Sequence, residues 1–219
     1  MRILGARWAR LALSAASILI SAGGVCVFAS AADVIESWEQ AGHPTAPTLK
    51  PVTADAKQTA LLLLDFNSSV CNMDKRPRCF QSLPKVAAIL KAARSAGVMV
   101  IYSLVRDGTL AALPSQIAAN PGEFTVPSFG ADKFYGTDLE QMLKKKDIHN
   151  LVLVGTSAQG AVLFTSGGAA LRGLKVIVPV DAASSEDLYG ELAATWVLAN
   201  GPASVSGHVT LTRSDLLHF

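Results

Sequence analysis

The sequence of 219 residues contains only three cysteines, and its 19 Lys and Arg nearly balance its 17 Asp and Glu. So few cysteines exclude a small fold held together by several disulfides. Because the net charge is close to zero, the chain lacks the excess of positive charge that binds a phosphate backbone. We therefore expect no nucleic acid partner. Half of the residues are apolar, which excludes a disordered or collagen-like chain.

Motifs that would hold a metal ion or a cofactor are also missing. The four histidines are scattered and no second cysteine pair is present, so the spacing gives no zinc site. Residues 155–160 (GTSAQG) lack both the G-x-G-x-x-G spacing of dinucleotide-binding proteins and the G-K-S/T of a P-loop. The sequence therefore predicts no metal and no cofactor.

Residues 1–31 have the pattern of a secretory signal peptide. A basic start is followed by the apolar stretch 11–28 and by Ala29-Ser30-Ala31, whose small side chains suit a signal peptidase. We expect cleavage after Ala31, loss of Cys26 with the peptide, and export to the periplasm or the extracellular space. The alternative is an uncleaved anchor, because about 18 apolar residues just span a bilayer. No later stretch is long and apolar enough to cross a membrane, so we expect no membrane contact after cleavage.

The two remaining cysteines, Cys71 and Cys79, lie close together in the segment CNMDKRPRC. In an oxidising compartment such a pair can close a short disulfide loop. The alternative is two unpaired thiols, one of them buried as a small hydrophobic side chain.

Apolar runs alternate with segments of helical periodicity along the chain. Continuous apolar runs favour strands buried on both faces, and helices between them imply parallel pairing through right-handed crossovers. We predict a single three-layer α/β domain at 58–219 with a mostly parallel sheet, preceded by an arm at 32–57 that packs across it. The predicted strands are 60–66, 98–105, 151–154, 175–180 and 209–212, and the predicted helices are 83–96, 137–146, 160–171 and 186–199.

In such a sheet the ligand binds beyond the carboxyl ends of the strands. Asp65 ends the first strand and is a candidate general base. The alternative is that it only caps a turn. The segment 155–161 is rich in small residues and precedes a helix, so its backbone N–H groups are candidate donors to an oxyanion. Asp181 ends another strand, where we expect the capping role because 182–185 has the pattern of a helix start.

Four stretches in this order resemble the isochorismatase-like cysteine hydrolases, the family of isochorismatases, nicotinamidases and N-carbamoyl amidases. They are ALLLLDF, FYGTDLEQML, LVLVGTSAQGAVLFT and KVIVPVDAAS, and they cover about 60–185. The resemblance implies the family's three-layer fold, hydrolysis of small amides or enol ethers, and a homo-oligomer.

The family's catalytic trio is an aspartate base, a lysine and a cysteine nucleophile. Asp65 falls on the base position, whereas residue counting places Ala161 at the nucleophile position and Ser128 at the lysine position. Lys133 is a displaced candidate for the lysine. The resemblance also implies a cis peptide between Thr156 and Ser157 and oxyanion donors at the N–H groups of Ser157 and Ala161.

A methyl group cannot attack a carbonyl carbon, so any hydrolysis would be atypical. Three routes stay open: water activated by Asp65, a hydroxyl from Ser157 or Thr165, or a displaced thiol from Cys71 or Cys79. A thiolate would need cations such as those of Lys75, Arg76 or Arg78 nearby, although we expect loop arginines to be solvated. The other hypothesis is a pseudoenzyme that binds a small molecule in the same pocket without turning it over.

Overall fold

The computed structural model describes residues 32–42 and 44–219, so the predicted signal peptide and Cys26 lie outside the described residues. The chain divides into two units, Met1–Pro44 and Thr45–Phe219. In the described part of the first unit, a 3-10 turn, η1, spans Trp38–Gln40.

The larger unit begins at Thr45, within the predicted arm at 32–57. Residues 45–57 belong to the larger unit, where β1 (Val52–Thr53) pairs in parallel with β9 (Leu217–His218). The Ala54 N–H also donates to the His218 carbonyl at 2.9 Å. These backbone bonds join the segment before the first long strand to the end of the chain.

The main sheet is parallel throughout, which confirms the predicted fold class. Its strand order is β4-β3-β2-β5-β6-β8, and the short β7 (Ala183–Ser184) pairs with the end of β5. The bounds are β2 Thr59–Leu64, β3 Met99–Ser103, β4 Phe124–Val126, β5 Asn150–Thr156, β6 Lys175–Pro179 and β8 Val209–Thr212.

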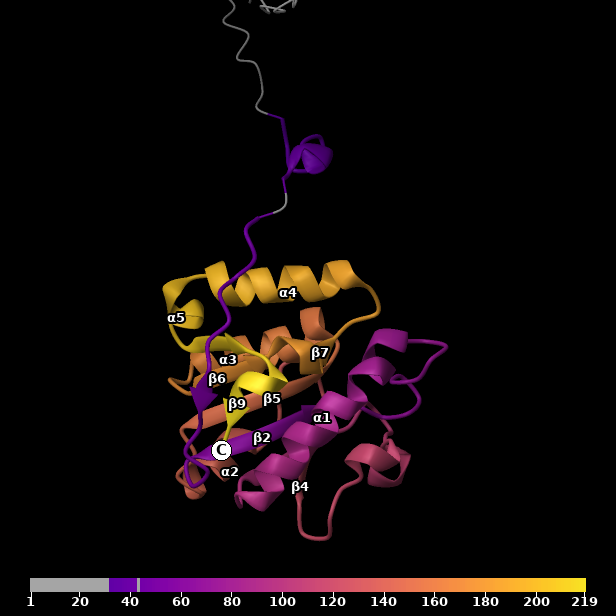
Figure 1. Cartoon of the computed structure of the whole chain (residues 1–219), viewed down its shortest axis with the longest axis vertical. Helices are drawn as coiled ribbons and strands as arrows, with labels where there is room; N and C mark the ends of the chain where they lie inside the picture. The colour runs from indigo at the N-terminus through magenta and orange to yellow at the C-terminus, as the bar shows by residue number, and fades with distance from the viewer. Residues whose placement is uncertain (1–31, 43) are drawn as a thin grey trace, which may run out of the picture. The chain divides into compact units, whose positions relative to one another are not determined.

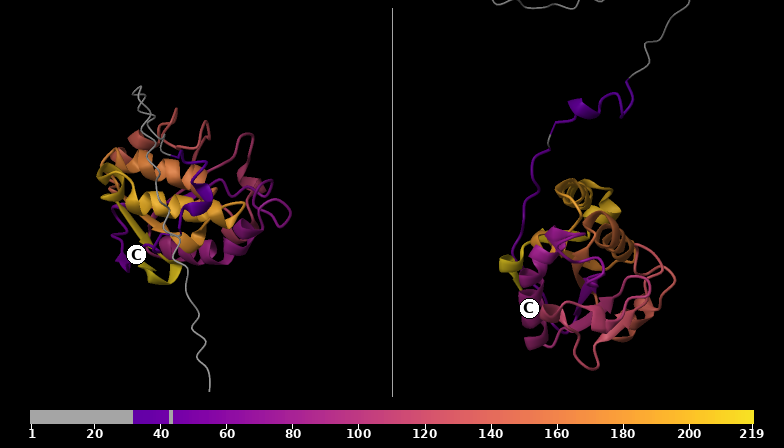
Figure 2. Two further views of the ribbon diagram at one scale, coloured as in Figure 1. Left: turned by 90° about the horizontal axis from the view of Figure 1, so that it is seen from above. Right: turned by 90° about the vertical axis from the view of Figure 1, so that its right-hand side faces the viewer.

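Helices cover both faces of this sheet. The helices are α1 (Pro77–Ser95), α2 (Leu139–Lys145), α3 (Leu163–Ala170), α4 (Leu188–Asn200) and α5 (Ala203–Ser206). Figure 1 labels them, and the right-hand view of Figure 2 shows α1 and α3 on opposite sides of the sheet. Short turns complete the fold: η2 (Leu110–Ala112), η3 (Ser115–Ile117), η4 (Ala158–Val162), η5 (Val180–Ala182) and η6 (Ser214–Leu216).

The alternation of side chains along β2 explains the two layers. All six of its residues are buried. Leu61 and Leu63 belong to the apolar cluster under α1. Ala60, Leu62 and Leu64 belong to the cluster under α2, α3 and α4. Because successive side chains point to opposite faces, a strand without exposed positions can only lie between two layers.

Two helices differ from their predicted bounds. Helix α1 begins at Pro77 rather than residue 83, because proline is well accommodated in the first turn, where its missing N–H has no intrahelical partner. The helix predicted at 160–171 begins instead with the π-helical turn η4 and continues as α3. In the part of the chain that the structure describes, no helix combines the length and apolarity needed to cross a bilayer.

Candidate functional site

Asp65 lies directly beyond β2, at the carboxyl edge of the sheet. Its φ of 60° is in the left-handed region, which aspartate tolerates better than most residues. Its Oδ1 accepts a hydrogen bond from the Ser103 hydroxyl at 2.7 Å, and its Oδ2 lies 2.8 Å from Lys133 Nζ. Its side chain is 15% exposed. Both carboxylate oxygens are therefore held in place while the group still reaches solvent.

Lys133 supplies the positive charge of this pair from the interior. Its side chain is only 1% exposed, and besides Asp65 its ammonium donates to Ser128 Oγ at 2.7 Å and to the Gly130 carbonyl at 3.1 Å. An ammonium group has three protons, and each of them has a partner here. This complete set of partners compensates the cost of burying the charge.

Residue counting placed Ser128 at the family's lysine position, but in the structure it is Lys133 that contacts Asp65. Ser128 does not replace the lysine; its hydroxyl accepts a hydrogen bond from Lys133. Residues 129–138 form bends and turns. They are tied to α3 because the Lys133 N–H donates to Thr165 Oγ1 and Thr165 Oγ1 donates to the Ala131 carbonyl, both at 3.2 Å. A residue count assumes that this loop has the same length and path as in the family. In this protein the loop instead turns Lys133 toward Asp65.

The end of β5 brings the small-residue segment beside Asp65. Leu64 of β2 pairs in register with Gly155 of β5, and a Cβ on Gly155 would lie 2.5 Å from Leu64 Cβ. Only glycine allows this approach of the two strands. The next peptide bond, between Thr156 and Ser157, is cis, as the family resemblance implies. The carboxylate and the candidate oxyanion donors therefore leave adjacent strands at the same edge.

The nucleophile position is occupied by a buried methyl group. Ala161 is 4% exposed and packs in the apolar cluster with Ala158 and Val162. The N–H groups of Gly160 and Val162 both donate to the Ser157 carbonyl, which fixes the turn at η4. Nothing at residue 161 can form a covalent intermediate.

The two sulfur atoms considered as displaced nucleophiles are joined to each other. Cys71 and Cys79 form a disulfide with a Cα–Cα distance of 5.4 Å, and both residues are buried. Neither can act as a thiolate in this state, so the structure contradicts the displaced-thiol route. Thr165 is also fully buried and bound to the loop at 131–133, which leaves it no role as a nucleophile.

The arginines of the disulfide loop and of α1 are not simply solvated, contrary to expectation. Arg76 Nη1 donates to Thr156 Oγ1 at 3.1 Å, which links the loop to the cis peptide. Arg78 binds both carboxylate oxygens of Glu191, with Nε and Nη2 at 2.7 and 2.5 Å. The hydrogen bonds that Arg78 donates to Glu191 raise the pKa of Arg78 above its ordinary value.

Asp181 does not cap the following helix. Its oxygens accept from the backbone N–H and the hydroxyl of Ser214 at 2.9 and 2.7 Å, and Lys85 Nζ lies 3.2 Å away. The N-cap of α4 is Asp187, which accepts from the Gly190 N–H at 2.8 Å. Burial raises the pKa of Asp181, but its hydrogen bonds with Ser214 and Lys85 outweigh burial and leave that pKa below its ordinary value.

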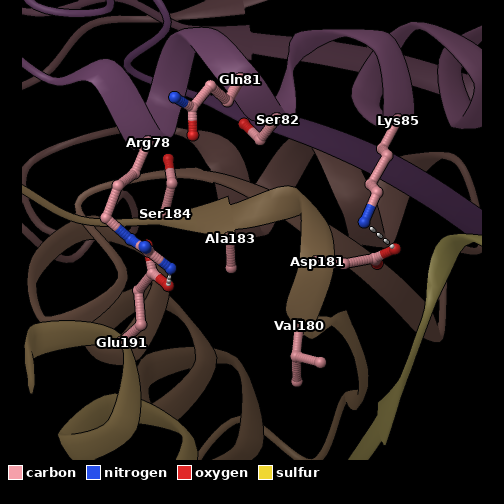
Figure 3. Close-up of a pocket in the computed structure, with 9 residues that line it drawn as sticks. All are labelled: Arg78, Gln81, Ser82, Lys85, Val180, Asp181, Ala183, Ser184 and Glu191. Atoms are coloured by element: carbon pink, nitrogen blue, oxygen red, sulfur yellow. Dashed lines mark hydrogen bonds and ion pairs between the residues drawn. The ribbon is translucent and has the colours of Figure 1, made fainter. Parts of the chain in front are cut away.

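A polar cavity of about 320 Å³ lies between α1 and residues 180–184 (Figure 3). None of Asp65, Lys133 and Ala161 lines it. Little in the sequence indicates this cavity, because one wall comes from residues 78–85 and the other from residues 180–191, about 100 positions further along the chain. Among the described residues, no group of three or more His, Cys, Asp or Glu side chains is arranged to hold a metal ion.

The fold and the Asp65–Lys133 pair define an isochorismatase-like α/β protein, and comparison with known proteins agrees. The family model of the isochorismatase domain matches residues 59–210, so the chain belongs to the isochorismatase family.

Among curated proteins, the chain is 28% identical over 158 residues to the secreted isochorismatase effector Isc1 of Verticillium dahliae, covering 67% of this chain and 83% of the relative. It is 27% identical over 174 residues to a streptothricin hydrolase of Streptomyces noursei, covering 74% of this chain and 65% of the relative. Among solved structures, a cysteine hydrolase from Pseudomonas syringae has a TM-score of 0.65 at 17% identity, covering 78% of this chain and 95% of that one. At that identity the structural likeness concerns the fold.

Proposed function

We propose that this protein is an exported pseudoenzyme of the isochorismatase family, which binds a small carbonyl compound in the family's pocket without thiol-dependent hydrolysis. The observation that carries the proposal is an intact Asp65–Lys133 pair at the edge of the sheet where β5 leads into η4, the turn that has a methyl group at residue 161. The binding groups are thus kept while the attacking group is absent.

The bound compound is expected to carry an amide, a carbamoyl group or an enol ether. Asp65 is placed to accept an N–H or O–H from such a ligand, and the N–H groups of Ser157 and Ala161 are the proposed donors to its carbonyl oxygen. The chemistry follows that of the relatives, one of which is an N-carbamoylsarcosine amidase of Arthrobacter, 28% identical over 124 residues that cover 44% of this chain and 47% of the relative.

Export is part of the proposal. The signal-peptide pattern at residues 1–31 supports it, as does the secreted effector among the relatives. The Cys71–Cys79 disulfide is consistent with an oxidising compartment.

A second candidate function is slow hydrolysis through a water molecule activated by Asp65. The observation that favours it is the 15% exposure of the Asp65 side chain. A carboxylate offers about four lone-pair sites, and the two hydrogen bonds to Asp65 leave some of these sites for water. Turnover of nicotinamide, carbamoyl amides or isochorismate by the unmodified protein, lost in Asp65→Asn, would establish this function and overturn the non-catalytic proposal.

The substitution Ala161→Cys tests the proposed site directly. We expect the rate at which iodoacetamide alkylates the new thiol to reach half of its maximum at a pH below about 8.5, the pKa of free cysteine. Hydrolysis of at least one of these substrates should rise about 100-fold or more above the background of the unmodified protein. The readouts are the alkylation rate against pH and a substrate screen.

The matched control is Ala158→Cys, which adds a thiol to the same turn at a residue buried to a similar extent. Its thiol should show neither the lowered midpoint nor the turnover. If Ala161→Cys behaves like this control, residue 161 does not face the Asp65–Lys133 pair and the proposal fails.

A further inference from the structure

The polar cavity beside α1 is lined by residues that are not part of the proposed site. Arg78, Ser82 and Lys85 line it from one face of α1, as their spacing of four and three residues requires. Asp181 and Ser184 line it from the opposite wall (Figure 3). Ser184 pairs in register with Thr156 of β5, so the cavity lies close to the edge of the sheet where the Asp65 site is found.

At each end of the cavity lies an ion pair whose carboxylate already has three donors. Glu191 accepts two hydrogen bonds from Arg78 and a third from the Ser185 N–H. At the other end, Asp181 accepts from Ser214 as well as from Lys85. The charges of the lining therefore cancel in pairs, and a ligand does not need to bring a compensating charge.

The two cations keep unused hydrogen-bond donors. Arg78 Nη1 makes no hydrogen bond within the described part of the chain, and Lys85 uses one of its three protons for Asp181. Their side chains are 40% and 53% exposed toward solvent. These donors are available to neutral oxygen atoms of a ligand without breaking either ion pair.

Ser184 gives an independent indication of a ligand. It is 3% exposed, and its Oγ has no hydrogen-bond partner among the described residues. A buried hydroxyl without a partner destabilises a folded protein and is uncommon in native structures. Figure 3 shows its side chain directed toward α1, whose residues form the opposite wall of the cavity. The hydroxyl is thus placed where a ligand in the cavity would bind it.

We propose that this cavity binds a neutral polyol of the size of one monosaccharide. Each hydroxyl of such a ligand both donates and accepts, which suits a wall where the donors of Arg78 and Lys85 alternate with the oxygen atoms of Ser82 and Ser184. The volume of about 320 Å³ accommodates one such ring. A carboxylate ligand gains no net advantage, because its attraction to Arg78 and Lys85 is offset by its repulsion from Asp181 and Glu191.

The experiment measures binding of glucose, galactose, mannose and myo-inositol to the disulfide-intact protein by chemical shift changes in NMR spectra. Glucuronate is the charged probe of matched size. We expect at least one neutral probe to shift the resonances of α1 and of residues 180–184, with an affinity that changes less than about twofold between low and high salt, because no net charge is neutralised.

The variant Ser184→Ala separates a binding role from a structural one. It should weaken binding by about fivefold, the equivalent of one hydrogen bond, while the melting temperature stays the same or rises. Ser166→Ala is the matched control, since Ser166 Oγ is also buried without a partner but lies in α3, outside the cavity lining. It should leave binding unchanged, as should Asp65→Asn, which keeps this test independent of the proposed function.

Three results would overturn the proposal. The first is no shift at α1 and 180–184 with any neutral probe. The second is tighter binding of glucuronate than of every neutral probe. The third is equal binding by the Ser184→Ala and Ser166→Ala proteins.

Discussion

Lys133 carries the largest electrostatic cost of any single residue in the candidate site. Its ammonium is buried and depends on Asp65, Ser128 and Gly130 for all of its hydrogen bonds. Since Asp65 keeps its bond from Ser103, removal of the lysine leaves a partly buried carboxylate with one donor instead of two.

We predict that Lys133→Met lowers the free energy of unfolding by about 3 kcal/mol, measured by urea denaturation. Lys144→Met is the control, because Lys144 is paired with Glu140 but is 74% exposed, and its loss should cost less than about 0.5 kcal/mol. The double variant Asp65→Asn with Lys133→Met should recover part of the loss. Equal stabilities of the Lys133→Met and Lys144→Met proteins would contradict the structural role of the pair.

Asp181 makes folding sensitive to acid. Its pKa in the folded protein is lowered below the ordinary value of 3.8, since its bonds with Ser214 and Lys85 outweigh the effect of burial. A carboxyl group with a lowered folded-state pKa stabilises the protein above its unfolded-state pKa, and that stability is lost as the pH falls through the folded-state value.

We therefore predict that the stability difference between the unmodified protein and Asp181→Asn is constant near neutral pH. It should shrink progressively as the pH falls below about 4. Denaturant midpoints measured across this range check the prediction. A difference that grows toward acid pH would show that the sign is wrong.

Among the elements, the loop between β2 and α1 depends on its disulfide. Cys71 and Cys79 enclose a short loop with the polar residues Asn72, Asp74 and Arg76, and the Arg76 side chain reaches Thr156 at the end of β5. The disulfide therefore joins the start of α1 to the loop that follows Asp65.

Replacement of both Cys71 and Cys79 by alanine should lower the free energy of unfolding by about 2–3 kcal/mol, the loop-closure value for a ring of this size. The measurement is guanidinium denaturation of the unreduced protein and of the double variant. A thiol titration of the unreduced, unfolded mature protein should find no free thiol. One free thiol per chain from either of these cysteines would contradict the structure.

The whole molecule is expected to be exported and shortened at its N-terminus. Cleavage after Ala31 gives a chain that begins at Ala32. Intact mass and N-terminal sequencing of the protein recovered from an expressing culture, with and without Ala29 and Ala31 replaced by a bulky residue, test this prediction. Full-length protein retained in the membrane fraction would instead support the uncleaved anchor.

The assembly of the protein stays a prediction as well. The exposed side chains of Leu188, Leu192 and Trp196 are spaced by four residues along α4, so they share one face of the helix. Sedimentation of the mature protein would establish whether it forms the homo-oligomer that the family resemblance implies.

The sequence by itself determined the layered architecture and the position of Asp65. A run such as 60–64 has no polar position, and therefore it can only form a strand between two layers of helices. The ordered motifs indicated the family, and three of the four span the ends of strands β2, β5 and β6. The sequence alone also shows that residue 161 is an alanine and therefore cannot act as a nucleophile.

Only the tertiary structure decided which side chains meet. Lys133 reaches Asp65 because the loop at 127–138 folds back on α3. The number of residues between two motifs does not predict how such a loop folds. Asp181 binds Ser214 rather than capping α4, and Ser184 faces α1, because segments distant in sequence pack against one another. Local patterns constrain strands and helices, whereas contacts between distant side chains depend on the packing of the complete chain.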